Sequence, residues 1–458
     1  MVLARLLSVQ EFGTAATASM IVLLLYPVTR FGVYDYLIQT ATVNDSVKTA
    51  AFVVSSIFGI TLFITVFLLS PAISSILGDS HLVDTLRLIS TIFIFAPIST
   101  VQEGLLAKKF RFRLLTTCQF AALLPSGLAG IGLAALGFGP LSIAVQHVTM
   151  VALTGLVMWF VQPWRPRFSG VGAHLWPMLR MGTSYTGGQF LSSINTNLFG
   201  LAVAAVGGTE AAGVFRVAWA GLQLCVQLTL LPVANVVQPL FAARKQDFQQ
   251  VRRSYTNVMR YFAAVAFAPF AFVGVTAPQL VELAFGPPWV QAGPALAIMT
   301  VFAIPSVPNY LIRSFLSAIG HPHQTVSLAI AETLLSIGLL LPLASWGIDG
   351  VAAAVALRAW ALLPVTLYLS RRYVDLGVKS VAASLVAPIL SGSALAVVAY
   401  MVKLQTISTL SMPMVLCLSG LSGLAAYLVV MCALDRKLVL ELAAVGGILL
   451  RRKGVVRS

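Results

Sequence analysis

The stretch that decides the fold is LLTTCQFAALLPSGLAGIGLAALGFGPLSIAVQHVTMVALTGLVMWFVQPW, residues 114–164, which contains no Asp, Glu, Lys or Arg. A helix needs about 20 mainly apolar residues to cross the hydrocarbon core of a bilayer. This stretch is too long for one crossing, and Gly137-Phe138-Gly139-Pro140 interrupts it near its middle. Because glycine and proline mark turns, residues 114–164 predict two membrane-spanning helices joined by a short turn.

Positive charge lies at both ends of this predicted hairpin, and the same arrangement continues outward along the chain. Every second junction between apolar stretches is basic, whereas residues 137–140, 207–210, 286–291 and 347–350 carry almost no Lys or Arg. Basic loops of membrane proteins face the cytoplasm. Of the 29 Lys and Arg, this topology places all but six on the cytoplasmic side; the six are Arg5, Arg87 and Lys403 outside, and Arg216, Arg313 and Arg358 within spans.

Counting apolar windows against the length of a crossing predicts an all-α polytopic membrane protein with about 13 complete transmembrane helices. Met1 to Ser8 resemble the last turns of a further apolar helix, so we expect a missing front half and 14 helices in all. The C-terminus is predicted to be cytoplasmic. The predicted spans are 12–32, 48–70, 86–107, 115–136, 140–161, 181–206, 210–240, 257–283, 292–319, 324–346, 348–370, 379–402 and 411–434.

Composition excludes several other classes of protein. Charged residues make up 9% of the 458 and hydrophobic residues 59%, whereas a soluble domain carries about 25% charged residues. The net charge of +15 is spread over short loops instead of one solvated face, so no nucleic-acid partner is expected. The four cysteines lie in apolar spans without paired spacing, and we expect neither a metal site nor a cofactor.

An internal duplication with an offset of about 200 to 211 residues is visible in the sequence. Gly13 to Gln39 is similar to Gly213 to Gln238, Pro97 corresponds to Pro308, and the turn at 137–139 corresponds to the turn at 347–350. An even number of helices lies between matching positions, so both halves have one orientation. Parallel repeats related by an axis along the membrane normal are typical of one class of alternating-access transporter.

Several short motifs follow one another along the chain: LARLLS at 3–8 with Glu11-Phe12-Gly13, KKFRFR at 108–113, Gly137-Phe138-Gly139, WRPRF at 164–168 and AIGHP at 318–322. Together they resemble the bacterial polysaccharide flippases, the O-antigen and exopolysaccharide translocases of the superfamily that includes MATE exporters and the lipid II flippase. The sequence departs from the family in the missing front of the first helix. It also has an uncharged run after Asn195 and Asn197, where relatives often carry Asp and Arg.

The resemblance implies two six-helix bundles, related by a pseudo-twofold along the membrane normal, around a central cavity, with two further C-terminal helices. We accordingly expect an N-terminal bundle over 1–175, a C-terminal bundle over 176–373, two extra helices over 374–434 and a basic cytoplasmic tail over 435–458. The resemblance also implies a protein of the inner membrane. This protein would move oligosaccharide linked to undecaprenyl pyrophosphate to the outer leaflet, for the biosynthesis of lipopolysaccharide, capsule or exopolysaccharide. Implied partners are that lipid, the bilayer, and a polysaccharide polymerase with its assembly proteins.

Candidate substrate-binding residues follow from the cost of charge inside a membrane. Charged side chains within spans are functional candidates by default, and arginine binds phosphate oxygens with two parallel hydrogen bonds. Arg358, near the midplane of its span, is the leading candidate for a pyrophosphate contact, followed by Arg216 and Arg313. Arg30 ends its helix at the cytoplasmic face, where it is an interfacial anchor or meets the incoming headgroup. Structural ion pairs and snorkelling side chains are the alternatives.

Two further residues are candidates for ion coupling. Glu332 lies about two turns into its span and could carry a proton, or pair with Arg358 or Arg313. His147, at mid-span, could titrate near neutral pH or be a hydrogen-bonded packing residue.

Two other functions remain open. A MATE-like multidrug exporter would need acidic residues deep in its spans, and a membrane-embedded polysaccharide polymerase would need a sizeable catalytic loop. The loops here are short, and no Asp-x-Asp, Walker A or Gly-x-Ser-x-Gly motif occurs, so we expect no enzyme activity.

Overall fold

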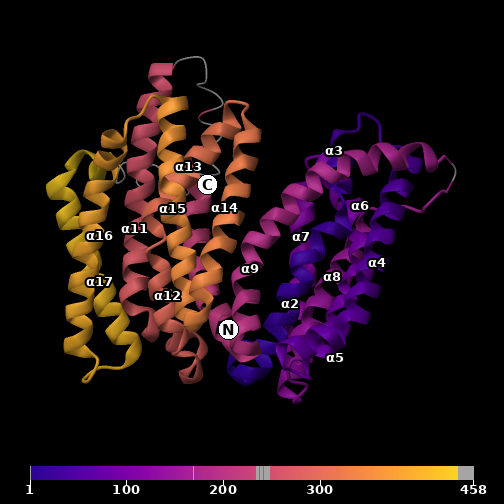
Figure 1. Ribbon diagram of the computed structural model, residues 1–458, viewed down its shortest axis with the longest axis horizontal. Helices are drawn as coiled ribbons and strands as arrows, with labels where there is room; N and C mark the ends of the chain where they lie inside the picture. The colour runs from indigo at the N-terminus through magenta and orange to yellow at the C-terminus, as the bar shows by residue number, and fades with distance from the viewer. Residues whose placement is uncertain (1, 169, 234–236, 238–240, 242–247, 442–458) are drawn as a thin grey trace, which may run out of the picture. The chain divides into compact units, whose positions relative to one another are not determined.

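The computed structural model describes residues 2–168, 170–233, 237, 241 and 248–441, and every regular element among them is a helix (Figure 1). Arg244 and Lys245, which the predicted topology places on the cytoplasmic side, lie outside the described residues, as does the chain beyond Glu441. The elements are α1 (Val2–Leu6), α2 (Val9–Arg30), α3 (Val33–Gln39), α4 (Asp45–Leu77), α5 (Leu82–Ser90), α6 (Ile92–Lys108), α7 (Phe112–Ala135), α8 (Leu141–Val161), α9 (Gly172–Cys225), η1 (Val226–Leu230), α11 (Phe248–Phe285), η2 (Pro287–Trp289), α12 (Ala292–Thr300), α13 (Ala303–Ala318), α14 (Pro322–Leu343), η3 (Ala344–Trp346), α15 (Gly347–Val374), α16 (Val378–Thr406) and α17 (Met412–Leu434).

The described chain has 10 helices that are long and apolar enough to cross a membrane, or 11 when the bent pair α12–α13 counts as one span. The prediction of an all-α polytopic membrane fold is therefore confirmed. Two of these segments, with 49 and 52 residues, far exceed one crossing. The first contains Gly208 at φ 77° and ψ −179°, a conformation that ends a helix and favours glycine. The second contains η3 and Gly347 at φ 72°. The finer count of 13 helices stays a prediction.

The hairpin predicted from residues 114–164 is present. Helices α7 and α8 pack against each other and are joined by a turn with Gly137 and Gly139 at positive φ. The first long helix, α2, begins at a capping box in which Ser8 and Glu11 satisfy each other's backbone N–H groups. That N-terminus places the start of α2 at Val9, three residues before the predicted span.

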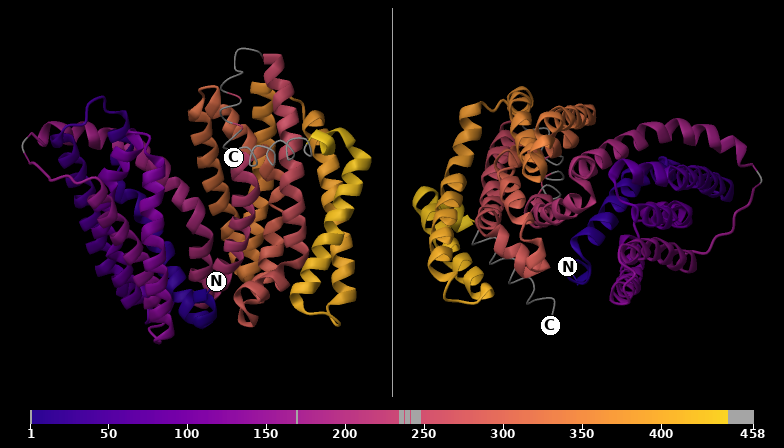
Figure 2. Two further views of the ribbon diagram at one scale, coloured as in Figure 1. Left: turned by 180° about the vertical axis from the view of Figure 1, so that it is seen from behind. Right: turned by 60° about the horizontal axis from the view of Figure 1, so that its bottom comes forward.

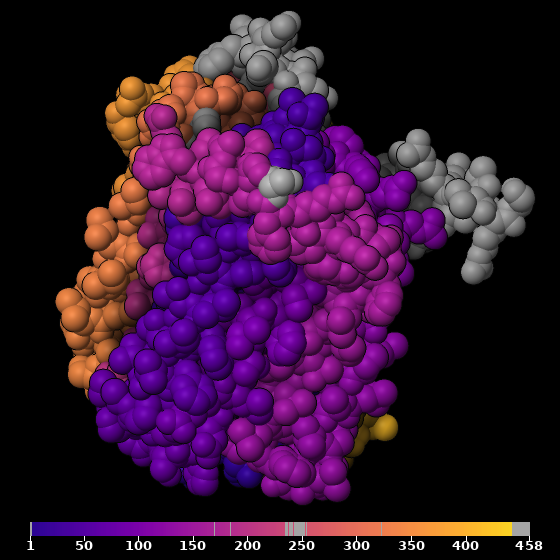
Figure 3. Space-filling view, turned by 90° about the vertical axis from the view of Figure 1, so that its right-hand side faces the viewer, coloured from indigo at the N-terminus to yellow at the C-terminus, as the bar shows by residue number. Residues whose placement is uncertain are grey.

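The chain divides into two compact units, unit 1 (1–216) and unit 2 (217–458). The predicted boundary at 175 stays a prediction. In unit 1, α2, α4, α5, α6 and α8 share a buried apolar cluster that includes Val22, Leu86 and Phe93. Figure 3 shows one face of this unit, where the indigo, violet and magenta helices pack directly against one another.

Small residues allow the helices of unit 1 to approach closely, as is common in membrane proteins. A Cβ added at Gly13 of α2 would overlap the carbonyl group of Thr209, and one added at Gly213 would overlap Gly13 itself. Gly13 and Gly213 are the two positions that begin the predicted duplication, and in the structure they contact each other.

In unit 2, the long helix α11 packs against α12, α13, α16 and α17. Helices α16 and α17 form a hairpin beside α11 (Figure 2). Two polar contacts hold this hairpin: the Tyr427 hydroxyl donates to the Ala264 carbonyl at 2.7 Å, and Lys403 Nζ donates to the Val275 carbonyl at 2.7 Å. Lys403 was predicted to lie outside the membrane, and its side of the membrane stays a prediction. In the structure its side chain is buried and binds α11.

Candidate functional site

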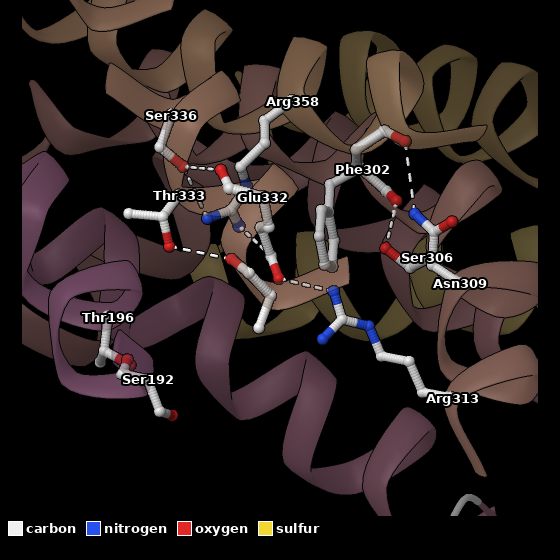
Figure 4. Close-up of polar contacts among 12 residues, drawn as sticks. Ser192, Thr196, Phe302, Ser306, Asn309, Arg313, Glu332, Thr333, Ser336 and Arg358 are labelled. Carbon is white, nitrogen blue, oxygen red and sulfur yellow. Dashed lines mark hydrogen bonds and ion pairs between the residues drawn. The ribbon is translucent and has the colours of Figure 1, made fainter. Parts of the chain in front are cut away.

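Three of the predicted residues meet in unit 2, each supplied by a different helix (Figure 4). Arg313 lies on α13, Glu332 on α14 and Arg358 on α15. Glu332 Oε2 is 2.7 Å from Arg313 Nη2, and Glu332 Oε1 is 3.5 Å from Arg358 Nη2. One carboxylate therefore pairs with two guanidinium groups, and each of its oxygens faces a different arginine. We call these three residues the Arg–Glu–Arg cluster.

The two arginines of the cluster differ in burial. The Arg358 side chain is only 7% exposed, and its Nη1 also donates to the Ser336 hydroxyl at 3.4 Å. The Arg313 side chain is 28% exposed and that of Glu332 is 21% exposed. Arg358 thus holds the carboxylate from the buried side, while Arg313 keeps donor groups nearer to the surface. With two cations and one anion, the cluster carries one excess positive charge.

Helix geometry explains how the cluster is assembled. Asn309 lies four residues before Arg313 and so on the same face of α13. Its side chain donates to the Ala359 carbonyl of α15 at 3.3 Å and accepts a hydrogen bond from Thr366, also on α15. These two contacts fix α13 against α15 one turn away from Arg313. On α14, Ser336 follows Glu332 by four residues, so both face Arg358.

A bend in the chain precedes this face of α13. Helices α12 and α13 meet at 55° across a break at 301–302. In unit 1, α5 and α6 are likewise separate helices, with the break at Thr91. The two breaks lie about 210 residues apart, which is the offset of the predicted duplication. The repeat itself stays a prediction.

Unit 1 contains a simpler ion pair. Arg30, the last residue of α2, forms a 2.7 Å salt bridge with Glu103 of α6. The Arg30 side chain is 33% exposed and that of Glu103 is 8% exposed, and the guanidinium also lies 5.5 Å from the centre of the Tyr26 ring. Arg30 ends its helix as predicted, and its guanidinium also forms an ion pair with the Glu103 carboxylate.

The other two candidates also belong to unit 1. His147 Nδ1 lies 2.9 Å from the Ile143 carbonyl, one turn earlier on α8, which is the arrangement of a hydrogen-bonded packing histidine. Arg216 is half-buried on α9. Within the described residues, Arg216 has no carboxylate partner within salt-bridge distance. The structure therefore joins Arg313, Glu332 and Arg358, whereas Arg30, His147 and Arg216 lie in unit 1.

One buried polar centre was missed by the sequence reasoning. Asp79, in the turn between α4 and α5, is 6% exposed. Its Oδ2 accepts hydrogen bonds from the hydroxyls of Thr14 on α2, at 2.5 Å, and Thr209 on α9, at 2.8 Å. An aspartate after a glycine in a short turn resembles any exposed loop acid, so no sequence signal marked it.

Known proteins resemble this chain in sequence and in fold. The family described as "Polysaccharide biosynthesis protein" matches residues 2–294. The Escherichia coli (strain K12) lipopolysaccharide biosynthesis protein WzxC is 24% identical over 73% of this chain and 66% of its own length. The Rhizobium meliloti (strain 1021) succinoglycan biosynthesis transport protein ExoT is 23% identical over 70% of this chain and 65% of its own length. The chain thus spans about two-thirds of the length of these relatives.

Among solved structures, the lipid II flippase MurJ in its inward closed conformation has the same fold. The TM-score is 0.79 at 14% sequence identity, and the match covers 96% of this chain and 95% of the other. At that identity the similarity concerns the fold alone.

Proposed function

Because the chain belongs to the family of polysaccharide biosynthesis proteins, we propose that it is a membrane flippase that moves lipid-linked oligosaccharide across the bilayer. Two independent lines support this. The curated relatives act in polysaccharide biosynthesis, and the name of one describes transport. The fold is shared with a lipid flippase. A biosynthetic family combined with a transporter fold favours the translocation of a precursor.

The observation that carries the proposal is the excess positive charge of the Arg–Glu–Arg cluster. An isolated cation inside a membrane span is unfavourable, so a neutral pair of one arginine and one glutamate would have a lower free energy. A second arginine on the same carboxylate leaves one charge for an anionic substrate. A pyrophosphate group fits, because guanidinium binds phosphate oxygens in parallel pairs. We assign the substrate contact to Arg313, the more exposed arginine, and a positioning role through Glu332 to Arg358.

This assignment changes the order of the predicted candidates. Arg358 led the sequence analysis because of its depth, but its side chain is the most buried of the three and faces Ser336 as well as Glu332. Arg216 and Arg30 remain candidates for phosphate contacts from unit 1, and His147 and Glu332 for ion coupling. A multidrug exporter of the same superfamily is less well supported, because a cationic drug would be repelled by the cluster.

Topology and partners complete the proposal. Counting the breaks at Gly208 and η3 as turns, and the bent pair α12–α13 as one span, would give 13 crossings. The C-terminus would then lie in the cytoplasm and the protein in the inner membrane. The bundle limits, the pseudo-twofold and the alternating-access mechanism inferred from the duplication belong to the proposal as well. A polymerase and assembly proteins would receive the translocated oligosaccharide.

The test is a flipping assay in proteoliposomes with a labelled lipid-linked oligosaccharide. The wild-type protein should transfer label faster than protein-free vesicles; equal rates would reject the function. Arg313→Gln should lower the rate at least tenfold. The matched control is Arg252→Gln, which removes an exposed cation that pairs with Asp375 at 3.1 Å, and it should change the rate less than twofold. Wild-type rates for Arg313→Gln would reject the assigned site but not the function.

A further inference from the structure

The turn between α6 and α7 contains a bulky residue in a conformation that favours glycine. Phe110 has φ +55°. The Arg111 N–H donates to the Leu106 carbonyl at 2.9 Å, and the Phe110 N–H donates to the Ala107 carbonyl at 2.9 Å. This is the Schellman pattern, in which the left-handed residue after the helix is usually glycine. For a bulky side chain a left-handed backbone is a true outlier.

Unit 2 contains the same turn with glycine in that place. After α13, Gly320 has φ +87°, the His321 N–H donates to the Leu316 carbonyl at 2.9 Å, and the Gly320 N–H donates to the Ser317 carbonyl at 3.4 Å. Each of these residues lies 210 positions after its counterpart in unit 1. Glycine forms the turn without steric cost. The phenyl ring at 110 is therefore not needed to make the turn, and strain of this kind clusters at functional sites.

The surroundings of Phe110 indicate what the ring contacts. It is 82% exposed, and it lies edge-to-face with Phe112, itself 52% exposed, at 6.1 Å between ring centres. Lys109, Arg111 and Arg113 alternate with these rings and are exposed.

Lys108, the fourth cation of the turn, points the other way. Its ammonium group donates to the carbonyls of Thr40 and Leu37, at the end of α3. One cation of the turn is thus structural, while two rings and three cations face outward.

We propose that residues 109–113 form a binding site for the headgroup of an anionic phospholipid. The turn joins two membrane-spanning helices, α6 ending at Lys108 and α7 beginning at Phe112, so it lies at the level of the headgroups. The phenyl rings enter the apolar edge of the interface, and Lys109, Arg111 and Arg113 surround the lipid phosphate. A basic residue close to an anionic headgroup contributes about fivefold to binding, and we assign that contribution to the three cations beside the rings. The site depends neither on the substrate nor on the direction of transport.

The charge requirement is tested by titrating fluorescent phosphatidylglycerol into the full-length protein in an uncharged detergent. Replacing Lys109, Arg111 and Arg113 together by alanine should weaken binding at least tenfold. The matched control removes three exposed cations at the cytoplasmic end of unit 2, Arg371, Arg372 and Lys379. The control set should change binding less than threefold. An equal loss in both sets, or no loss in the first, would overturn the proposal.

The ring is tested by Phe110→Gly, which relieves the strained backbone. The thermal unfolding temperature should stay the same or rise, while phosphatidylglycerol binding falls severalfold. Unchanged lipid binding would overturn the role of the ring. Undecaprenyl pyrophosphate serves as the competitor. If it displaces phosphatidylglycerol when present at one hundredth of the phosphatidylglycerol concentration, the turn is a substrate site instead.

Lipid binding by the triple-alanine variant and flipping by the wild-type protein test the two proposals separately. Lipid binding that survives in the variant rejects the headgroup site, whatever the flipping rate. A wild-type protein that binds phosphatidylglycerol but flips no oligosaccharide rejects only the proposed function.

Discussion

Glu332→Gln is the substitution that tests the Arg–Glu–Arg cluster most directly. Glutamine has nearly the same shape and keeps one acceptor oxygen, but it removes the charge that neutralises Arg313, at 2.7 Å, and Arg358, at 3.5 Å. Breaking a fully buried ion pair costs about 3–5 kcal/mol, because a charge is left without compensation. The Arg358 side chain is almost fully buried, whereas Arg313 and Glu332 are partly exposed. We therefore expect a loss of about 3 kcal/mol in the free energy of unfolding, at the low end of that range.

Unit 1 provides the matched control. Glu103→Gln leaves a single cation, Arg30, whose side chain is one-third exposed. Water can solvate that cation, so the loss should be about 1.5 kcal/mol, at the low end for a hydrogen bond to a charged group. The difference between the two losses in the free energy of unfolding measures the cost of leaving the buried Arg358 without this carboxylate.

A double substitution separates charge from packing. In Glu332→Gln with Arg358→Met, the buried cation that faced the carboxylate is gone as well, and replacing a buried ion pair by apolar residues is often close to neutral. The double variant should therefore be more stable than Glu332→Gln alone. Stability would be measured by SDS-induced unfolding in detergent, followed by circular dichroism. The reasoning fails if Glu332→Gln costs less than Glu103→Gln, or if adding Arg358→Met lowers stability further.

Three further predictions concern single contacts and use the same unfolding measurement. Asp79→Asn should cost about 2 kcal/mol, because the hydrogen bond from the Thr209 hydroxyl, at 2.8 Å, would lose its charged acceptor; a loss below about 0.5 kcal/mol would show that the charge is not needed. Gly13→Ala should cost about 3 kcal/mol, the upper end of the usual cost of overpacking, since a methyl group there overlaps the backbone of α9. Gly127→Ala, with open space around it, should be neutral or slightly stabilising. Equal effects of the two glycine substitutions would contradict the close helix crossing. Phe110→Gly should raise the free energy of unfolding by up to about 1 kcal/mol; a clear loss would show that the left-handed backbone at this position carries no strain.

The membrane fold could be predicted from local sequence because a bilayer imposes a local requirement. Each crossing must be a run of about 20 apolar residues, and residues 114–164 show two such runs with a Gly-Pro turn between them. The predicted spans agree with the observed helices within a few residues at most ends. The predicted break at 207–210 is present at Gly208, where the backbone leaves the helical region. Hydropathy does not resolve bends within a span, so the 55° break between α12 and α13 was not predicted.

The candidate site was only partly predictable. The sequence marked Arg313, Glu332 and Arg358 as charges inside apolar spans, and it allowed Glu332 to pair with either arginine. It could not show that Glu332 contacts both, because that depends on how three helices pack. Asp79 lay outside the prediction for the opposite reason: its sequence neighbourhood is that of a loop, and its burial comes from α2 and α9, which are distant in the chain.

Local sequence therefore determined that this is an all-helical membrane protein and where its apolar helices lie. Through the family resemblance it also indicated the class of molecule that the protein is proposed to move. Tertiary structure alone decided which charges neutralise one another. A crossing depends on the hydrophobicity of consecutive residues, which can be read along the chain. The excess charge of the Arg–Glu–Arg cluster depends on distances between side chains on three helices, the difference in burial between Arg313 and Arg358, and the packing that Asn309 maintains between α13 and α15.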